Sequence, residues 1–241
     1  MKTQIPAIGV FAFGLIATLA FVAWIQQLAP NTTIDRQAFC LPANCFCEAV
    51  SSTIPKQPSN TWSSLGFVFV GLIIALKGKL TSFTFLSSLA LYFVGIGSAY
   101  YHALLSYTGQ VFDVLGMFLV LTTILCYRWA QASGRNWISV WLLLNTVALI
   151  AQAAVPSMRR YLFGIVMLMF LIQEVRLRSG TTSFRNFNIA LGTFALAFAI
   201  WILDITLTVC QPDLWLQGHA VWHLLGATSC WFLYKHSSQF V

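Results

Sequence analysis

The sequence predicts an all-α integral membrane protein, a bundle of membrane-spanning helices. Of its 241 residues, 59% are hydrophobic and only 8% are charged, and the mean hydropathy is +0.79. A soluble domain of this size needs more polar surface, so we expect most of the surface to face lipid. The net charge of +7 does not indicate nucleic-acid binding, because the basic residues stand singly or in pairs between apolar runs.

Eight stretches have the length and apolar character that a membrane-spanning helix needs, which is about 20 residues. We number them spans 1 to 8; they are Ile5–Leu28, Trp62–Leu76, Phe83–Ser106, Val111–Trp129, Trp137–Val155, Tyr161–Val175, Phe187–Thr208 and Leu214–Tyr234. Span 1 follows Lys2 and resembles a signal peptide, but its apolar core is long and no clean Ala-x-Ala site follows. We therefore expect residues 1–29 to form an uncleaved anchor, residues 30–60 a polar loop, and residues 61–241 a membrane domain.

The distribution of Lys and Arg predicts the orientation of the chain. Eight spans place the loops alternately on two sides, and nine of the thirteen basic residues fall on the side of the termini. Those nine are Lys2, Lys77, Lys79, Arg128, Arg135, Arg176, Arg178, Arg185 and Lys235; the other four are Arg36, Lys56, Arg159 and Arg160. Cytoplasmic loops are enriched in Lys and Arg, so both termini are expected in the cytoplasm. The opposite side is then exoplasmic, meaning periplasmic, luminal or extracellular.

Four of the six cysteines fall on the exoplasmic side of this topology, namely Cys40, Cys45, Cys47 and Cys210. An oxidising compartment permits one or two disulfides among them. We favour a Cys47–Cys210 disulfide, which ties the long loop to the end of span 7. The alternative is that the cysteines are free, small apolar residues.

Polar residues from four spans meet at the exoplasmic end of the predicted bundle. Ser98 and His102 share one helix face in span 3, and His219 and His223 share one in span 8, since each pair is four residues apart. Ionisable groups within membrane spans are costly and usually functional. The complete set is Ser98, His102, Asp113, Asp204, His219 and His223.

These residue types point to a catalytic Zn²⁺ site. Three histidines, His102, His219 and His223, match the ligand number of catalytic zinc, which leaves one position open for water. Bound Zn²⁺ makes hydroxide available near neutral pH. Asp113 is then placed to take and return a proton, and Ser98 to donate a hydrogen bond to a developing oxyanion. His236, at the opposite end of span 8, is too far away to take part.

Each residue also has a simpler explanation. The histidines could be ordinary hydrogen-bonded side chains, and Ser98 could be a small residue at a helix interface. Asp113 could cap its helix. Asp204 could orient an imidazole or act only as a buried hydrogen-bonding group. These explanations taken one by one do not account for the convergence of all six residues at one depth.

The pattern resembles the alkaline ceramidases, within a superfamily of seven-helix membrane hydrolases that includes adiponectin-type receptors. The resemblance runs from about Phe46 to the C-terminus. The motifs that carry it are Phe46-Cys47-Glu48, Asn60-Thr61-x-Ser63, Gly97-Ser98-x-x-x-His102 with Asp113, Trp201-x-x-Asp204, and His219-x-x-Trp222-His223. It implies a Zn²⁺ ion on His102, His219 and His223, with Ser98 and Asp113 beside it. Asp204 and Trp222 are candidates to support the ligands.

The resemblance also implies the reaction: hydrolysis of the amide of a ceramide-like membrane lipid by water, which gives a sphingoid base and a fatty acid. Residues 61–241 would be the seven-helix ceramidase-like domain, and span 1 an addition to it. No obligatory protein partner is evident. Animal members bind Ca²⁺ through an acidic loop, of which only Glu48 clearly survives here, with Gln57 in the place of a carboxylate. Because Ca²⁺ prefers several charged oxygen ligands, we expect calcium dependence to be absent or weak.

Two rival functions stay open at this point. The first is a seven-helix receptor or transporter with a structural zinc, which a closed four-ligand site would favour. The second is a hydrolase with the same chemistry that acts on another lipid amide or on an ester.

Overall fold

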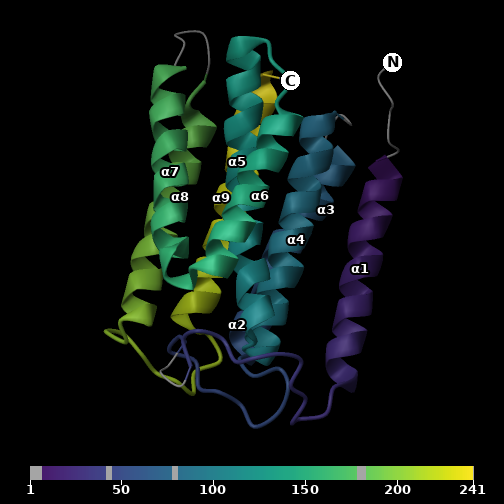
Figure 1. The fold of residues 1–241 in the computed structure, drawn as a ribbon, viewed down its shortest axis with the longest axis vertical. Coiled ribbons are helices and arrows are strands. Elements are labelled where there is room, and N and C mark those ends of the chain that lie inside the picture. Colours follow the sequence, from purple (N-terminus) through teal and green to yellow (C-terminus); the bar gives the residue numbers. More distant parts are fainter. Residues whose placement is uncertain (1–6, 42–44, 78–80, 178–182, 241) are drawn as a thin grey trace.

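A computed structural model describes residues 7–41, 45–77, 81–177, 183–240 of the chain, and these form an upright bundle of helices (Figure 1). The α-helices are α1 (Ala7–Gln27), α2 (Pro58–Ser63), α3 (Leu65–Lys77), α4 (Ser82–Leu104), α5 (Tyr107–Ser133), α6 (Ile138–Ala154), α7 (Arg159–Arg176), α8 (Arg185–Ile205) and α9 (Gly218–Ser237). Two short 3₁₀ helices, η1 (Pro156–Met158) and η2 (Ser238–Phe240), precede α7 and follow α9. The predicted all-α class is confirmed.

Every predicted span contains a helix, and the chain is a multi-pass membrane protein. Five stretches within the described ranges are long and apolar enough to cross a membrane: Ala7–Gln27, Pro58–Lys77, Ser82–Leu104, Tyr107–Ser133 and Arg185–Ile205. Span 2 therefore begins at Pro58, four residues before the predicted start, and includes both α2 and α3. α9, the helix of span 8, begins only at Gly218, because the preceding residues fold as a loop.

α1 stands at one edge of the bundle and packs against α3 and α4 (Figure 1). The contact is close because the ring of Tyr92 on α4 lies directly against Gly14 of α1 and Gly71 of α3. A side chain at either glycine would collide with the ring. The close packing fixes α1 to the bundle, while exposed apolar residues such as Ile8 and Ile16 cover its outer face.

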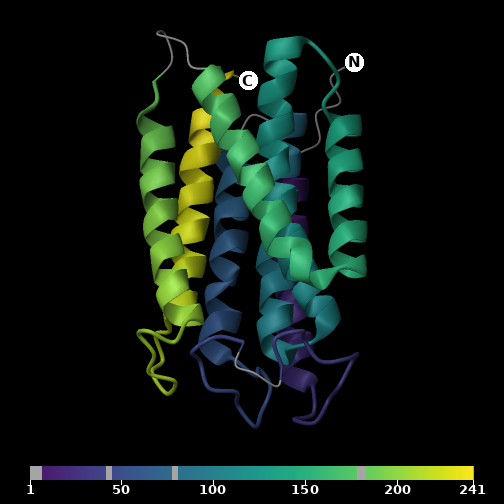
Figure 2. The same cartoon turned by 60° about the vertical axis from the view of Figure 1, so that its left-hand side comes forward.

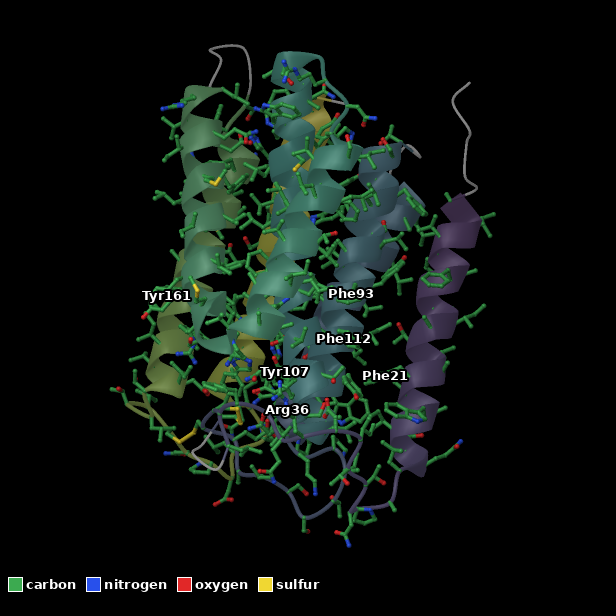
Figure 3. All side chains as sticks on the ribbon, in the orientation of Figure 1. Phe21, Arg36, Phe93, Tyr107, Phe112 and Tyr161 are labelled. Atoms are coloured by element: carbon green, nitrogen blue, oxygen red, sulfur yellow. A yellow bond between two sulfur atoms is a disulfide. The ribbon has the colours of Figure 1, made fainter. Side chains whose placement is uncertain are left out.

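α4 and α5 form a tight antiparallel pair that brings the candidate catalytic residues together. Only Leu105 and Ser106 separate the two helices, and the Ser106 hydroxyl caps α5 by accepting the Gly109 N–H at 3.1 Å. Gly97 of α4 lies against the backbone of Phe112, and Gly116 of α5 lies against Val94. On the outer side of the pair, Phe93 and Phe112 pack edge to face with ring centroids 5.8 Å apart (Figure 3).

The long connections lie together at one end of the bundle. The described parts of residues 28–57 and residues 206–217 cover the end at which α4 finishes and α9 begins (Figures 1 and 2). Disulfides Cys40–Cys45 and Cys47–Cys210 stabilise this end, and the second is the pairing that the sequence analysis favours. Arg36 stacks on the Tyr107 ring at 3.7 Å and so fixes the loop to the start of α5 (Figure 3).

Candidate metal centre

Three histidine side chains meet inside the bundle, next to the end that is covered by the long loops. His102 comes from the last turn of α4, and His219 and His223 come from the first turns of α9. The ring centroids are 4.5 to 5.1 Å apart, and one ligand nitrogen from each ring lies within 4.8 Å of the others. All three side chains are buried. The four-residue spacing and the antiparallel course of α4 and α9 therefore bring three imidazoles to one point.

The hydrogen bonds of the rings fit a metal ion. His102 Nδ1 lies 2.8 Å from Gln57 Oε1, and His223 Nδ1 lies 2.9 Å from the Ser63 hydroxyl. By contrast, His102 Nε2 and His219 Nδ1 are buried and have no hydrogen-bond partner among the described residues. Buried ring nitrogens without partners are costly, and three clustered imidazoles, two of them oriented by polar groups at Nδ1, are a typical zinc ligand set.

The sequence does not predict that Gln57 and Ser63 hydrogen-bond the rings of two of these histidines. Gln57 is fully buried; its amide accepts from the His102 ring and donates to the Glu48 carbonyl at 3.3 Å. Its backbone N–H also donates to the His102 carbonyl at 3.0 Å. Gln57 immediately precedes the short helix α2 and Ser63 is its last residue, and this helix shows no hydrophobic periodicity. The sequence signals for them were the Asn60-Thr61-x-Ser63 motif, which contains Ser63, and the place of Gln57 where the family has a calcium-loop carboxylate.

Ser98 lies between the histidines and Asp113. Its hydroxyl is 3.4 Å from His223 Nε2, accepts a hydrogen bond from the Ser64 hydroxyl at 3.2 Å, and also hydrogen-bonds the Asp113 side chain. Asp113 is half-buried and lies two turns inside α5, whose cap is Ser106. The explanation of Asp113 as a helix cap is therefore wrong, and its carboxylate is free to face the site.

Asp204 supports the site through the backbone. Its Oδ2 accepts the His219 N–H at 3.0 Å, and its Oδ1 accepts the Cys47 N–H at 3.1 Å. The carboxylate thus caps the start of α9 from α8 and holds the loop beside it. Both of these hydrogen bonds come from backbone N–H groups, so the Asp204 carboxylate orients the backbone and not an imidazole ring. Trp222 packs against Trp201 and Phe194 in the wall of a cavity.

The loop places one aromatic ring directly on the histidines. Phe46 lies between two disulfide-bonded cysteines, Cys45 and Cys47, and its ring stacks on His219 with centroids 3.7 Å apart. The two disulfides therefore hold an apolar cover over the centre.

The carboxylate of Glu48, which the family resemblance relates to a calcium loop, hydrogen-bonds the backbone of α2. Its two carboxylate oxygens accept the N–H groups of Ser59 at 2.6 Å and Asn60 at 2.9 Å. Burial raises the pKa of Glu48, and these two hydrogen bonds act in the opposite direction. Glu48 therefore caps α2, the helix that carries Ser63 towards His223.

A cavity of about 580 Å³ connects the centre with the interior of the bundle. Ser98, Asp113, His219 and His223 lie in its wall, and the rest is largely apolar, supplied by α5, α7, α8 and α9. This size and lining suit a lipid chain.

The fourth histidine lies in a separate buried cluster at the other end of α9, as predicted. His236 Nε2 is 3.0 Å from Glu174 Oε2, and Arg128 Nε is 3.0 Å from Glu174 Oε1. Arg128 is only 3% exposed. Its assignment to a cytoplasmic loop is therefore wrong, because the guanidinium is neutralised inside the bundle and does not report on topology.

Comparison with protein families identifies the family to which the chain belongs. A family model described as Ceramidase matches residues 45–239, which includes every candidate site residue and leaves α1 outside. A comparison with curated proteins found no match. The match covers most of the chain and confirms the resemblance noted in the sequence. The chain therefore belongs to the ceramidase family of membrane hydrolases.

Proposed function

We propose that this protein is a zinc-dependent hydrolase that cleaves the amide of ceramide-type lipids to a sphingoid base and a fatty acid. The observation that carries the proposal is the group of three buried histidines beside Ser98 and Asp113 in the wall of an apolar cavity. His102, His219 and His223 would hold the ion. Zinc in this position supplies a Lewis acid for the carbonyl and a source of hydroxide near neutral pH.

The protein's own residues then divide the remaining work. Asp113 takes the proton of the attacking water and returns it to the nitrogen of the leaving amine. Ser98 directs its hydroxyl hydrogen at the oxygen on which negative charge develops. Gln57 and Ser63 fix the orientation of two imidazole rings through their Nδ1 atoms. The apolar cavity holds the lipid chain and limits access of water to the amide.

The site would face the exoplasmic side, with both termini in the cytoplasm. The two disulfides at the loop end support this orientation, because disulfides persist in oxidising compartments. A receptor or transporter with a structural zinc is less well supported. Among the residues that the structure describes, the candidate ligand group has three members and adjoins a cavity, whereas a structural site is closed by four.

The test is ceramide hydrolysis by the purified full chain in lipid nanodiscs, with products identified by mass spectrometry. We expect about one zinc per chain, in keeping with the one three-histidine group among the residues that the structure describes. Release of the sphingoid base should stop when zinc is chelated and return when zinc is restored. His219→Ala should lose both zinc and turnover. Activity in a metal-free preparation would reject zinc dependence, and bound zinc without product would favour the structural-zinc alternative.

The cavity also predicts how chain-length preference can be changed. Gly164 on α7 lines the cavity, and a Cβ placed there meets no other atom within 4 Å. In Gly164→Phe we expect the ring to occupy space that the lipid chain needs. Each buried methylene contributes about 0.8 kcal/mol, so displacing two should lower kcat/KM for long-chain relative to short-chain ceramides roughly tenfold.

Gly192→Phe on α8 is the matched control for this substitution. Gly192 has equally open surroundings but lies outside the cavity wall. The ratio of kcat/KM values should be measured with ceramides in which the acyl chain and the base are shortened one at a time. Equal chain-length profiles for the two variants would show that the lipid does not occupy this part of the cavity.

A further inference from the structure

Two arginines at the start of α7 lie in the wall of the cavity that contains the metal centre. Arg159 and Arg160 line the same cavity as Ser98 and Asp113. The next residue, Tyr161, is 74% exposed and points out of the bundle (Figure 3). From the sequence, both arginines are expected only to mark the orientation of the chain. On the exoplasmic side, where basic residues are fewest, their position in an otherwise apolar wall needs another explanation.

Neither arginine is neutralised by an ion pair within the described parts of the chain. Arg159 Nη1 donates to the neutral amide oxygen of Gln110 at 3.1 Å, and the Arg160 guanidinium lies 5.8 Å from the Trp201 ring. The carboxylate of Asp113 attracts Arg159 without forming an ion pair, and the two arginines repel each other. Arg128, at the other end of the bundle, provides the contrast, because Glu174 neutralises it.

The arrangement leaves excess positive charge beside a lipid-sized cavity. Arg159 is partly buried, and a guanidinium in apolar surroundings is costly without a counter-ion, whereas Arg160 is exposed at the mouth of the cavity wall. The cost is increased because both residues occupy the first turn of a helix, where the backbone already carries partial positive charge. An oxyanion offsets the desolvation of Arg159, the repulsion between the two arginines and the partial positive charge at the start of the helix. Two guanidinium groups also offer paired N–H donors that match a carboxylate or phosphate.

We propose that Arg159 and Arg160 form a subsite for the oxyanion of a lipid whose chain lies in the cavity. The identification of this oxyanion as a product of the reaction rests on the proposed function. Hydrolysis breaks the amide C–N bond and forms a C–O bond, so that one product is a fatty acid with an ionised carboxylate. The leaving amine takes the proton. The fatty-acid carboxylate is thus the anion that the reaction itself supplies, and an anionic headgroup on the sphingoid base is the second source.

The test is equilibrium binding to the full chain in nanodiscs, which requires no turnover. Palmitate is compared with hexadecanol, which has the same chain without the charge. The phosphate monoester of a sphingoid base is compared with the unmodified base in the same way. The variants are Arg159→Gln, Arg160→Gln and the double variant. Arg36→Gln is the matched control, because Arg36 lies at the same end of the bundle but outside the cavity wall.

We expect wild type and Arg36→Gln to bind palmitate at least about tenfold more tightly than hexadecanol, the usual strength of a charge-assisted contact. The double variant should lose this preference and bind hexadecanol as before. An arginine-dependent preference confined to the phosphate would assign the subsite to the headgroup. If neither anion shows an arginine-dependent preference, the proposal is overturned.

Parallel measurement of ceramide hydrolysis separates this proposal from the proposed function. Active protein without the palmitate preference would remove the subsite and leave the hydrolase intact. Protein that keeps the arginine-dependent preference but does not cleave ceramide would reject the hydrolase and leave the subsite.

Discussion

Asp113→Asn is expected to lower kcat for ceramide by roughly 10²- to 10⁴-fold, the range that general acid–base catalysis contributes. The substitution keeps the size of the side chain and its ability to hydrogen-bond Ser98. It removes the ability to accept a proton from water and return it to the amine. Because Asp113 is not a member of the three-histidine group, the variant should retain wild-type zinc content.

Three measurements on the Asp113→Asn variant decide its interpretation: turnover, zinc per chain and thermal stability. Asp213→Asn is the matched control, since Asp213 lies exposed in the α8–α9 connection and loses the same charge. Unchanged turnover in Asp113→Asn would remove Asp113 from the chemistry. Loss of zinc or of stability together with turnover would instead assign it a structural role.

The convergence at the metal centre was predictable from the sequence because it depends on two simple regularities. Residues four apart share a helix face, and helices that enter and leave from one side bring their ends together. These two rules place His102, His219 and His223 at one depth without any knowledge of packing. The close approach of Ser98 and Asp113 has a similar origin, since Gly97 and Gly116 let α4 and α5 pack tightly.

The contacts around the histidines were harder to predict from the sequence. Gln57 and Ser63 belong to a loop and a six-residue helix, where no periodicity indicates the direction of a side chain. The hydrogen bonds of Asp204 depend on the path of two loops at the end of α8. Counting charges treats Arg159 and Arg160 only as topology signals, because it cannot distinguish a solvated loop from the wall of a cavity.

Charge counting fails most clearly for Arg128, because its partners come from distant parts of the sequence. Glu174 lies 46 residues away on α7, and His236 lies near the end of α9. The Arg128 guanidinium also stacks on the Phe240 ring at 3.4 Å, and the Tyr127 hydroxyl donates to the Phe240 carbonyl at 3.0 Å. This cluster therefore connects α5, α7, α9 and η2 at the end of the bundle opposite the metal centre.

Glu174→Gln should destabilise the protein by about 3–5 kcal/mol, because it leaves the Arg128 guanidinium buried without its counter-ion. Glu174 is 0% exposed and Arg128 only 3%, so water cannot compensate for the lost charge. Thermal unfolding of the full chain in nanodiscs, or unfolding in a denaturing detergent, measures the effect. Zinc content at temperatures below the transition should stay unchanged, since the cluster is remote from the histidines.

The double variant Arg128→Met/Glu174→Leu distinguishes a lost ion pair from a general packing defect. Removing both charges eliminates the desolvation cost, so most of the stability lost in Glu174→Gln should return. The His236 ring would still pack between Phe184 and Phe187, whose ring centroids lie 5.1 and 5.4 Å from it. A double variant no more stable than Glu174→Gln would mean that shape, rather than charge, holds this end of the bundle together. Wild-type stability in Glu174→Gln would mean that the ion pair contributes nothing to the fold.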